Sequence, residues 1–133
     1  MRCMLDTNVC IDYMRGKNQV LANKLCACQL GELCISSITL SELLFGVHRS
    51  SDPVRNRESL NKLLAKIDVL DFDTLASEAY GALRNDLARR GSLIGPLDML
   101  IAAHAKSQHL ILVTHNTSEF KRVRDLIIED WYQ

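Results

Sequence analysis

The first ten residues of the chain, MRCMLDTNVC, place an acid directly after a short apolar run. Residues 3–5 form that run, and Asp6 separates it from Thr7 and Asn8. An apolar run of this length, followed by polar residues and a helical pattern, predicts a buried strand that leads into a helix. Ligands of open α/β sheets bind just beyond the carboxyl ends of the strands, where Asp6 would lie. The alternative is that Asp6 only caps the following helix.

The composition fits one globular domain. The chain has 133 residues, of which 47% are hydrophobic, so we expect a single domain with its own core over residues 1–133. No apolar run approaches the roughly 18 residues that span a bilayer, and Asp6 interrupts the N-terminus before a signal peptide could form. The five cysteines lack Cys-x-x-Cys spacing, which favours reduced thiols. We therefore expect a cytoplasmic protein without a membrane segment.

The charges balance, with 16 basic and 16 acidic residues. This balance excludes nucleic-acid binding through bulk positive charge but allows local basic patches. Six basic residues are candidate phosphate contacts, although such side chains are more often solvated surface charges. They are Arg84, Arg89, Arg90, Lys121, Arg122 and Arg124.

Predicted strands and helices alternate along the chain. The strands cover residues 3–5, 34–35, 69–70, 110–114 and 127–128. The helices cover 9–29 in two pieces broken around residue 16, then 38–48, 53–67, 73–90 and 96–104, with a turn near 119–120. Four of these helices have an expected buried face, formed by Leu40, Leu43, Leu44 and Val47; Leu60, Leu63, Leu64 and Ile67; Leu75, Ala79, Leu83 and Leu87; and Leu97, Leu100, Ile101 and His104. Alternation of this kind predicts parallel strands joined by crossover helices, an α/β fold.

Three further acids lie near predicted helix starts. Glu42 ends the segment TLSE, a capping-box pattern that places it in the first turn after the second strand. Asp98 lies in the first turn of the helix that begins at residue 96, and Glu119 follows Asn116 in a second capping-box pattern. Each acid alone can be explained as a helix cap, because carboxylates satisfy free amides at helix N-termini.

Taken together, the acids predict a metal centre. Asp6, Glu42 and Glu119 each follow a strand and would project to one edge of a parallel sheet. Carboxylates gathered in one place repel each other unless a cation lies among them. Hard oxygen ligands suit Mg²⁺ or Mn²⁺.

Four segments carry a resemblance to a known family. MLDTNVCIDYM, ISSITLSELLFG, GPLDMLIAAHA and LILVTHNTSEF resemble the four signature blocks of PIN-domain ribonucleases, in order and at family spacing. The match is closest to the VapC-type toxins of bacterial toxin–antitoxin pairs. The resemblance implies a three-layer α/β/α sandwich with a central parallel sheet and a metal-dependent endoribonuclease site.

By this resemblance, Asp6, Glu42 and Asp98 correspond to the three principal acids of the family. The family's fourth acid belongs to a T-x-D-x-x-[DE]-F block, in which this chain has Asn116 at the first acidic place and Glu119 at the second. Glu119 is therefore the candidate fourth catalytic acid, and Asn116 could orient a ligand or the substrate. Three more polar residues match supporting positions: Thr7, Asn8 and Thr114.

The expected chemistry is hydrolysis of an RNA phosphodiester, for which one or two Mg²⁺ ions would lower the pKa of a water and neutralise charge on the phosphate. We expect Asp6 and Asp98 to be the first metal ligands, with Glu42 a ligand or the group that orients the attacking water. The resemblance also implies a tRNA substrate, with the anticodon loop of initiator tRNA as the leading candidate. It further implies a VapB-type antitoxin that blocks the acidic pocket, and a homodimer.

Two other functions remain open at this point. A phosphatase of the haloacid-dehalogenase type also has an aspartate after its first strand, but it needs a second carboxylate where this chain has Asn8. Release of phosphate from a generic phosphomonoester would distinguish it. A non-catalytic RNA-binding module on the same fold is disfavoured by the three acids, whose repulsion would serve no purpose without a metal.

Overall fold

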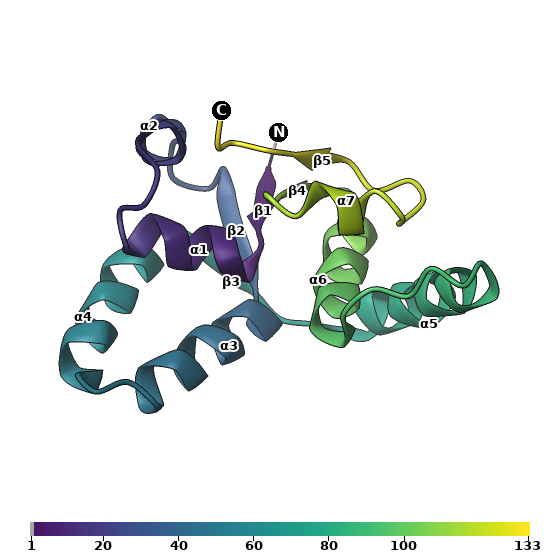
Figure 1. Ribbon diagram of the computed structural model, residues 1–133, viewed down its shortest axis with the longest axis horizontal. Helices are drawn as coiled ribbons and strands as arrows, with labels where there is room; N and C mark the ends of the chain where they lie inside the picture. Colours follow the sequence, from purple (N-terminus) through teal and green to yellow (C-terminus); the bar gives the residue numbers. More distant parts are fainter. Residues whose placement is uncertain (1) are drawn as a thin grey trace.

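Five parallel strands form the centre of the computed structural model, which describes residues 2–133 (Figure 1). Met1, the first residue of the predicted domain, lies outside the described residues. The strands are β1 (Cys3–Leu5), β2 (Leu33–Ser36), β3 (Asp68–Leu70), β4 (Ile111–Val113) and β5 (Ile128–Glu129). Their order in the sheet is β3-β2-β1-β4-β5, and each neighbouring pair is parallel, as the alternation of strands and helices predicts.

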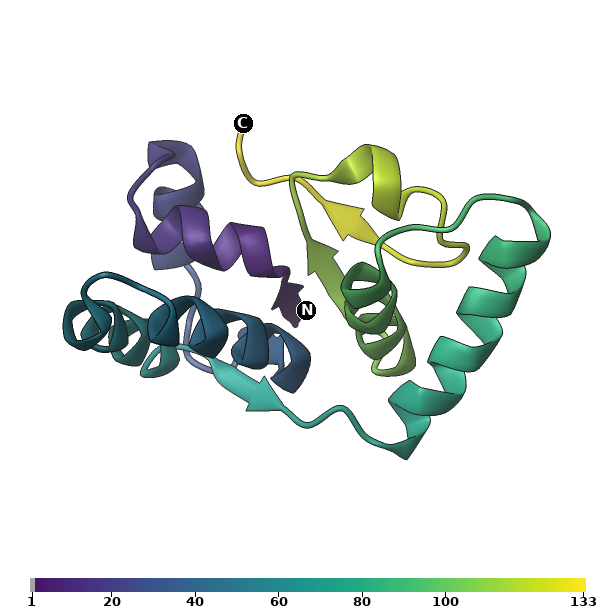
Figure 2. The same cartoon turned by 60° about the horizontal axis from the view of Figure 1, so that its bottom comes forward.

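Helices cover both faces of the sheet. They are α1 (Thr7–Met14), α2 (Gln19–Cys26), α3 (Ser37–His48), α4 (Pro53–Leu64), α5 (Thr74–Arg89), α6 (Pro96–Ser107) and α7 (Thr117–Phe120). In both views α1 to α4 lie on one side of the strands, and α5 and α6 lie on the other (Figures 1 and 2). The chain is therefore a three-layer α/β/α sandwich, as expected.

The central strands are buried on both faces. Cys3 and Leu5 of β1 pack into the core under α1 to α4, whereas Met4 packs into the core under α5 and α6. The same alternation holds in β2 and β4. A strand covered on both faces needs apolar side chains at every position. This explains why β1 and β4 are continuous apolar runs in the sequence.

Side chains at strand ends and loop ends determine where most helices begin. Asn18, Asp52 and Asp73 precede α2, α4 and α5, and each accepts a hydrogen bond from the backbone amide three residues later. Caps of this kind satisfy amides that have no partner inside the helix. The predicted break between the first two helices is confirmed, since α1 ends at Met14 and α2 begins at Gln19.

Two of the expected buried helix faces are wrong at their first residue. Leu75 of α5 is 65% exposed and Leu97 of α6 is 45% exposed, and Ala76 is the buried residue of the first turn of α5. In α6, all of residues 101–105 are buried. Residues 101–105 are all buried because α6 lies between the sheet and α5 and is covered on more than one side. Its buried residues therefore do not form a single stripe along the helix.

None of the helices within residues 2–133 is long and apolar enough to cross a membrane. Over the same residues, the five cysteines form no disulfide bond.

Candidate active site

The site lies where the strand order turns. β1 and β4 are neighbours in the sheet. From β1 the sheet extends through β2 to β3 at one edge, and from β4 it extends to β5 at the other edge. Ligands of open α/β sheets bind at such a switch point, beyond the carboxyl ends of the strands. Asp6 follows β1 there and Thr114 follows β4. The amide of Asp6 donates to the carbonyl of Val113 at 3.1 Å, so the two strand ends are held side by side.

Asp6 combines the two roles that the sequence allows. Its Oδ1 accepts a hydrogen bond from the amide of Val9 at 2.9 Å and so caps α1. Its Oδ2 accepts from the hydroxyl of Thr114 at 2.5 Å. The side chain is buried, and burial raises the pKa of Asp6, while the bonds from Thr114 and Val9 act in the opposite direction. Capping therefore occupies one carboxylate oxygen and does not exclude a second function.

Glu42 is not a helix cap, which corrects the expectation from the TLSE pattern. Strand β2 leads directly into α3, with Ser36 as the N-cap, so Glu42 lies in the second turn. The hydroxyl of Ser36 accepts from the amide of Ile38 at 3.1 Å and supplies the cap. Glu42 instead accepts a hydrogen bond of 2.6 Å at Oε1 from the hydroxyl of Thr7. The first residue of α1 thus fixes an acid of α3.

Asp98 lies in the first turn of α6, as predicted. It is half-buried, and its pKa rises to about 7, first because of burial and then because of the negative charges of Glu119, Asp6 and Glu42. Asp6, which follows β1, and the acids of α3, α6 and α7 therefore surround one region. The backbone packs closely there, since a Cβ on Gly95 would lie 3.1 Å from Oδ2 of Asp98.

Glu119 is held by two donors. Its Oε1 accepts from the amide of Gly95 at 2.7 Å, and its Oε2 accepts from the side-chain amide of Asn116 at 2.5 Å. The alternative that Glu119 is only a capping-box residue is wrong, because Asn116 makes no side-chain cap bond to α7 and Glu119 bonds a loop of another element. The bond from Gly95 is the main cause that lowers the pKa of Glu119. The two pKa values therefore shift in opposite directions, that of Glu119 downward and that of Asp98 upward.

The predicted supporting residues lie around these acids. Thr7 and Thr114 each donate to an acid, and Asn116 donates to Glu119. Asn8 is exposed on the first turn of α1 and lines a cavity of about 320 Å³ together with Asp6 and Asn116.

The donor set fits a hard divalent cation. As the side chains stand, no three His, Cys, Asp or Glu residues within 2–133 converge closely enough to hold an ion. Burial raises the pKa of Asp98 to about 7, and the negative charges of Glu119, Asp6 and Glu42 add to this rise. A divalent cation would relieve that repulsion, and carboxylate oxygens are the ligands that Mg²⁺ and Mn²⁺ prefer.

Four of the six basic candidates already have protein partners. Arg84 donates to the hydroxyl of Tyr80 at 2.8 Å. Arg90 donates to Asp86 at 2.7 Å, and Arg124 lies 3.6 Å from the same carboxylate. Arg122 donates to the carbonyl of Leu93 at 3.0 Å. These contacts give the four arginines a structural role, and RNA contact by any of the six residues stays a prediction.

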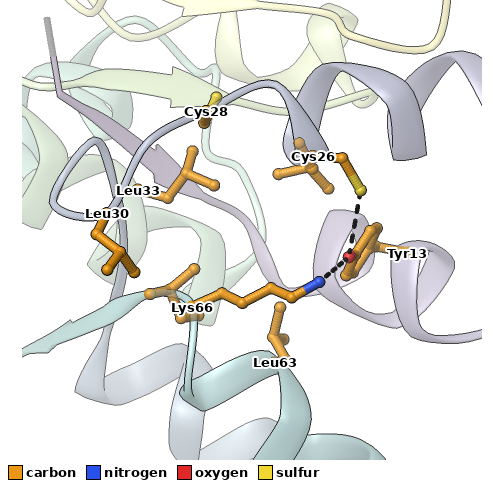
Figure 3. A pocket seen from close by; sticks show the side chains of 9 residues that line it. Tyr13, Cys26, Cys28, Leu30, Leu33, Leu63 and Lys66 are labelled. Atoms are coloured by element: carbon orange, nitrogen blue, oxygen red, sulfur yellow. Dashed lines mark hydrogen bonds between the residues drawn. The ribbon is translucent and has the colours of Figure 1, made fainter.

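Sequence analysis missed three residues of the 320 Å³ cavity, Asp12, His115 and Tyr132. His115 and Tyr132 follow β4 and β5, as Asp6 follows β1, so the position after a strand could have identified them. A separate cavity of about 220 Å³ lies among α1, α2, α4 and β2, where Lys66 donates to the hydroxyl of Tyr13 at 3.1 Å (Figure 3). It contains none of the four acids.

Comparisons with known proteins agree on one family. Residues 3–126 match the PIN domain family. A relative from Shigella flexneri, named tRNA(fMet)-specific endonuclease VapC, is 44% identical over 131 residues, which cover 98% of each chain. A relative of the same name from Salmonella typhimurium is 40% identical with the same coverage.

Solved structures agree with these relatives. The structure of VapBC2 from Rickettsia felis, bound to a DNA fragment from its promoter, contains a chain that superimposes with a TM-score of 0.93. The two chains are 36% identical, and the match covers 98% of this chain and 99% of the other. DNA-bound VapBC from Salmonella typhimurium gives the same TM-score at 40% identity, with 98% of each chain covered.

Proposed function

The chain belongs to the VapC-type ribonucleases of the PIN domain family, and from this membership we propose that it is a Mg²⁺-dependent endoribonuclease that cleaves tRNA. We also propose that residues 1–133 form one PIN-like domain. The observation that supports the site most strongly is the crowding of four acids at the switch point of the sheet, where burial and then the charges of the other three acids raise the pKa of Asp98 to about 7. Such crowding costs free energy unless a cation binds there.

The acids and their donors have distinct roles in this proposal. Asp6 and Asp98 are the first metal ligands. Glu42 is a ligand or orients the attacking water, and the hydroxyl of Thr7 fixes its carboxylate. The hydroxyl of Thr114 favours the ionised form of Asp6, which a ligand of a cation must have. Bound Mg²⁺ or Mn²⁺ lowers the pKa of a water and neutralises charge on the phosphate.

Glu119 is the fourth catalytic acid of the proposal. The amide of Gly95 and the side chain of Asn116 hold it in its ionised form beside Asp98. A charge at this position strengthens attraction for a cation without requiring that Glu119 touch the ion.

We propose initiator tRNA, cut in the anticodon loop, as the substrate. The support is that relatives 44% and 40% identical over nearly the whole chain are named tRNA(fMet)-specific endonucleases. A tRNA substrate places the enzyme in the cytoplasm. The phosphatase alternative has no observation in its favour, because the position that needs its second carboxylate is the exposed and neutral Asn8.

The proposed partner is a VapB-type antitoxin that covers the acidic pocket. The support is that two of the most similar solved chains come from VapBC complexes. The expected homodimer stays a prediction, which sedimentation of the isolated chain would test.

The test of the function is cleavage of an initiator-tRNA transcript by the purified chain. Cleavage should vanish in EDTA and return with Mg²⁺ or Mn²⁺, and Asp6→Asn should abolish it. Asp71→Asn, which changes an exposed acid outside the site, is the matched control and should cleave normally. Undiminished cleavage in EDTA would overturn the metal mechanism. Equal cleavage of an elongator tRNA would overturn the proposed substrate.

A further inference from the structure

The cavity beside Asp6 is lined in part by residues that have no role in the acid site. Its volume of about 320 Å³ lies at the lower end of the range for small-ligand pockets, about 300–1,000 Å³. Its wall is built from α1 and from the segments that follow β1, β4 and β5, so the cavity is continuous with the switch point of the sheet. The residues that line it are Asp6, Asn8, Asp12, His115, Asn116 and Tyr132.

Two aromatic rings form part of this wall. The rings of His115 and Tyr132 are stacked, with centroids 4.2 Å apart and an angle of 18° between their planes. Asp130 holds both residues, because its carboxylate lies 3.0 Å from Nδ1 of His115 and accepts from the amide of Tyr132 at 2.9 Å. The hydroxyl of Tyr132 donates to Asp12 at 2.5 Å. The pair is thus fixed before any ligand binds.

The imidazole remains accessible despite this support. The side chain of His115 is 59% exposed, although one face of its ring stacks on Tyr132. A flat ring with fixed orientation and an accessible surface is what a stacking contact requires. Unpaired bases of RNA loops are commonly stacked on aromatic side chains in this way.

The charge of the cavity selects among the parts of an RNA chain. Apart from Asp6, the proposed metal ligand, Asp12 lines it and Asp130 lies beside it. Carboxylates repel a phosphate that has no cation to bridge it, whereas they accept hydrogen bonds from the amino groups of a base. A nucleobase therefore fits the cavity better than a phosphate does.

We propose that His115, supported by Tyr132, is the stacking platform for a nucleobase adjacent to the scissile phosphate. The inference rests on the ribonuclease function proposed above, because Asp6 on the same cavity wall is the acid that would bind the metal. His115 thereby positions the substrate, and the base that stacks on it contributes to the choice of cleavage site.

The test combines changes in the protein with changes in the RNA. The probe is an RNA hairpin that reproduces the anticodon stem and loop of initiator tRNA, cleaved in saturating Mg²⁺. A series of hairpins then carries one abasic nucleotide at each loop position in turn. The variants are His115→Ala, His115→Phe, which keeps a flat ring, and His48→Ala as a matched control on the exposed end of α3. Thermal melting of each variant checks the fold.

With the intact hairpin, His115→Ala should raise KM by about 5- to 150-fold, the range of one base–aromatic stack, with a much smaller change in kcat. His115→Phe should restore most of the loss, and His48→Ala should match the wild type. At one loop position, the abasic nucleotide should raise the KM of the wild type by a similar factor. The same abasic hairpin should not raise the KM of His115→Ala any further, because removing the base and removing the ring abolish the same contact.

Three results would overturn the platform. The first is a wild-type KM in His115→Ala, and the second is a His115→Phe variant as impaired as His115→Ala. The third is that, at every loop position, the fold-increases in KM from the abasic nucleotide and from His115→Ala multiply. Each of these leaves the ribonuclease function intact, provided that the wild type cleaves the intact hairpin. A wild type that cleaves neither this hairpin nor whole tRNA would overturn the proposed function and the inference with it.

Discussion

Replacing Asp98 by asparagine should stabilise the metal-free protein at pH 8 while it abolishes RNA cleavage. The carboxyl of Asp98 has its pKa raised from 3.8 to about 7, mainly by burial and then by the charge of Glu119. At pH 8 the folded protein must therefore keep a charge that its surroundings disfavour. Asparagine has nearly the same shape and carries no charge, so the variant avoids this penalty.

The size of the gain follows from the pKa. A rise from 3.8 to about 7 corresponds to about 4 kcal/mol for a carboxyl that is fully removed from water. Asp98 is only half-buried, so solvent screens its interactions and we take about 2 kcal/mol. Its charge also favours the N-terminus of α6, and losing that contribution costs about 0.5 kcal/mol. The net gain at pH 8 should therefore be about 1–2 kcal/mol in the free energy of unfolding.

The gain must depend on pH in one direction. The pKa of Asp98 is higher in the folded state than in the unfolded chain, so the folded state binds the proton more tightly. The wild type consequently loses stability as the pH rises from about 4 to about 7, and above that range the full penalty is present. The difference between Asp98→Asn and the wild type should be small at pH 4 and largest at pH 8.

Urea unfolding in EDTA at the two pH values measures this difference, with Asp71→Asn as a control for loss of a negative charge. Added Mg²⁺ should then stabilise the wild type more than Asp98→Asn, because a ligand that binds only the folded state raises its stability. An Asp98→Asn protein less stable than the wild type at pH 8, or an equal gain at both pH values, would refute the reasoning. A less stable variant would mean that the carboxylate of Asp98 acts as a helix cap.

Three more variants test the neighbouring contacts. Thr114→Val removes the 2.5 Å bond to Asp6, so the pKa of Asp6 should rise further and the acid limb of the pH–rate profile should move to higher pH. Gly95→Ala should lower cleavage without lowering the melting temperature, because its Cβ would crowd Asp98 at 3.1 Å while alanine stiffens the unfolded chain. Glu119→Gln should raise the Mg²⁺ concentration for half-maximal activity and leave part of the activity at saturating Mg²⁺. If this Mg²⁺ concentration does not change, the charge of Glu119 does not contribute to metal binding.

The sheet could be predicted because its signals are local. A strand buried on both faces must be apolar throughout, and residues 3–5 and 110–113 meet that condition in the sequence. The position of Asp98 was also predictable, since proline at residue 96 fixes the start of its helix. The family resemblance to VapC-type ribonucleases is confirmed by relatives that match nearly the whole chain.

The errors occur where a tertiary contact decides the outcome. The TLSE pattern predicted a cap at Glu42, but β2 leads directly into α3, so Ser36 becomes the N-cap and Glu42 is free to bond Thr7. A capping pattern describes only four consecutive residues and carries no information about where the preceding strand ends. The contact between His115 and Tyr132 depends on β4 and β5 lying side by side, which no local pattern contains.

The neutral residue at position 116 is consistent with a charge at position 119. Asn116 donates from its amide to Oε2 of Glu119 at 2.5 Å, and an ionised aspartate at that place could only accept. Two carboxylates at such a distance would compete for one proton, and one of them would lose its charge near neutral pH. The same amide helps to keep Glu119 ionised, next to an Asp98 whose own pKa is already raised to about 7. The amide at 116 therefore replaces the acid of the first acidic place with a donor to the second, so the departure from the family pattern preserves an ionised carboxylate at Glu119 beside Asp98.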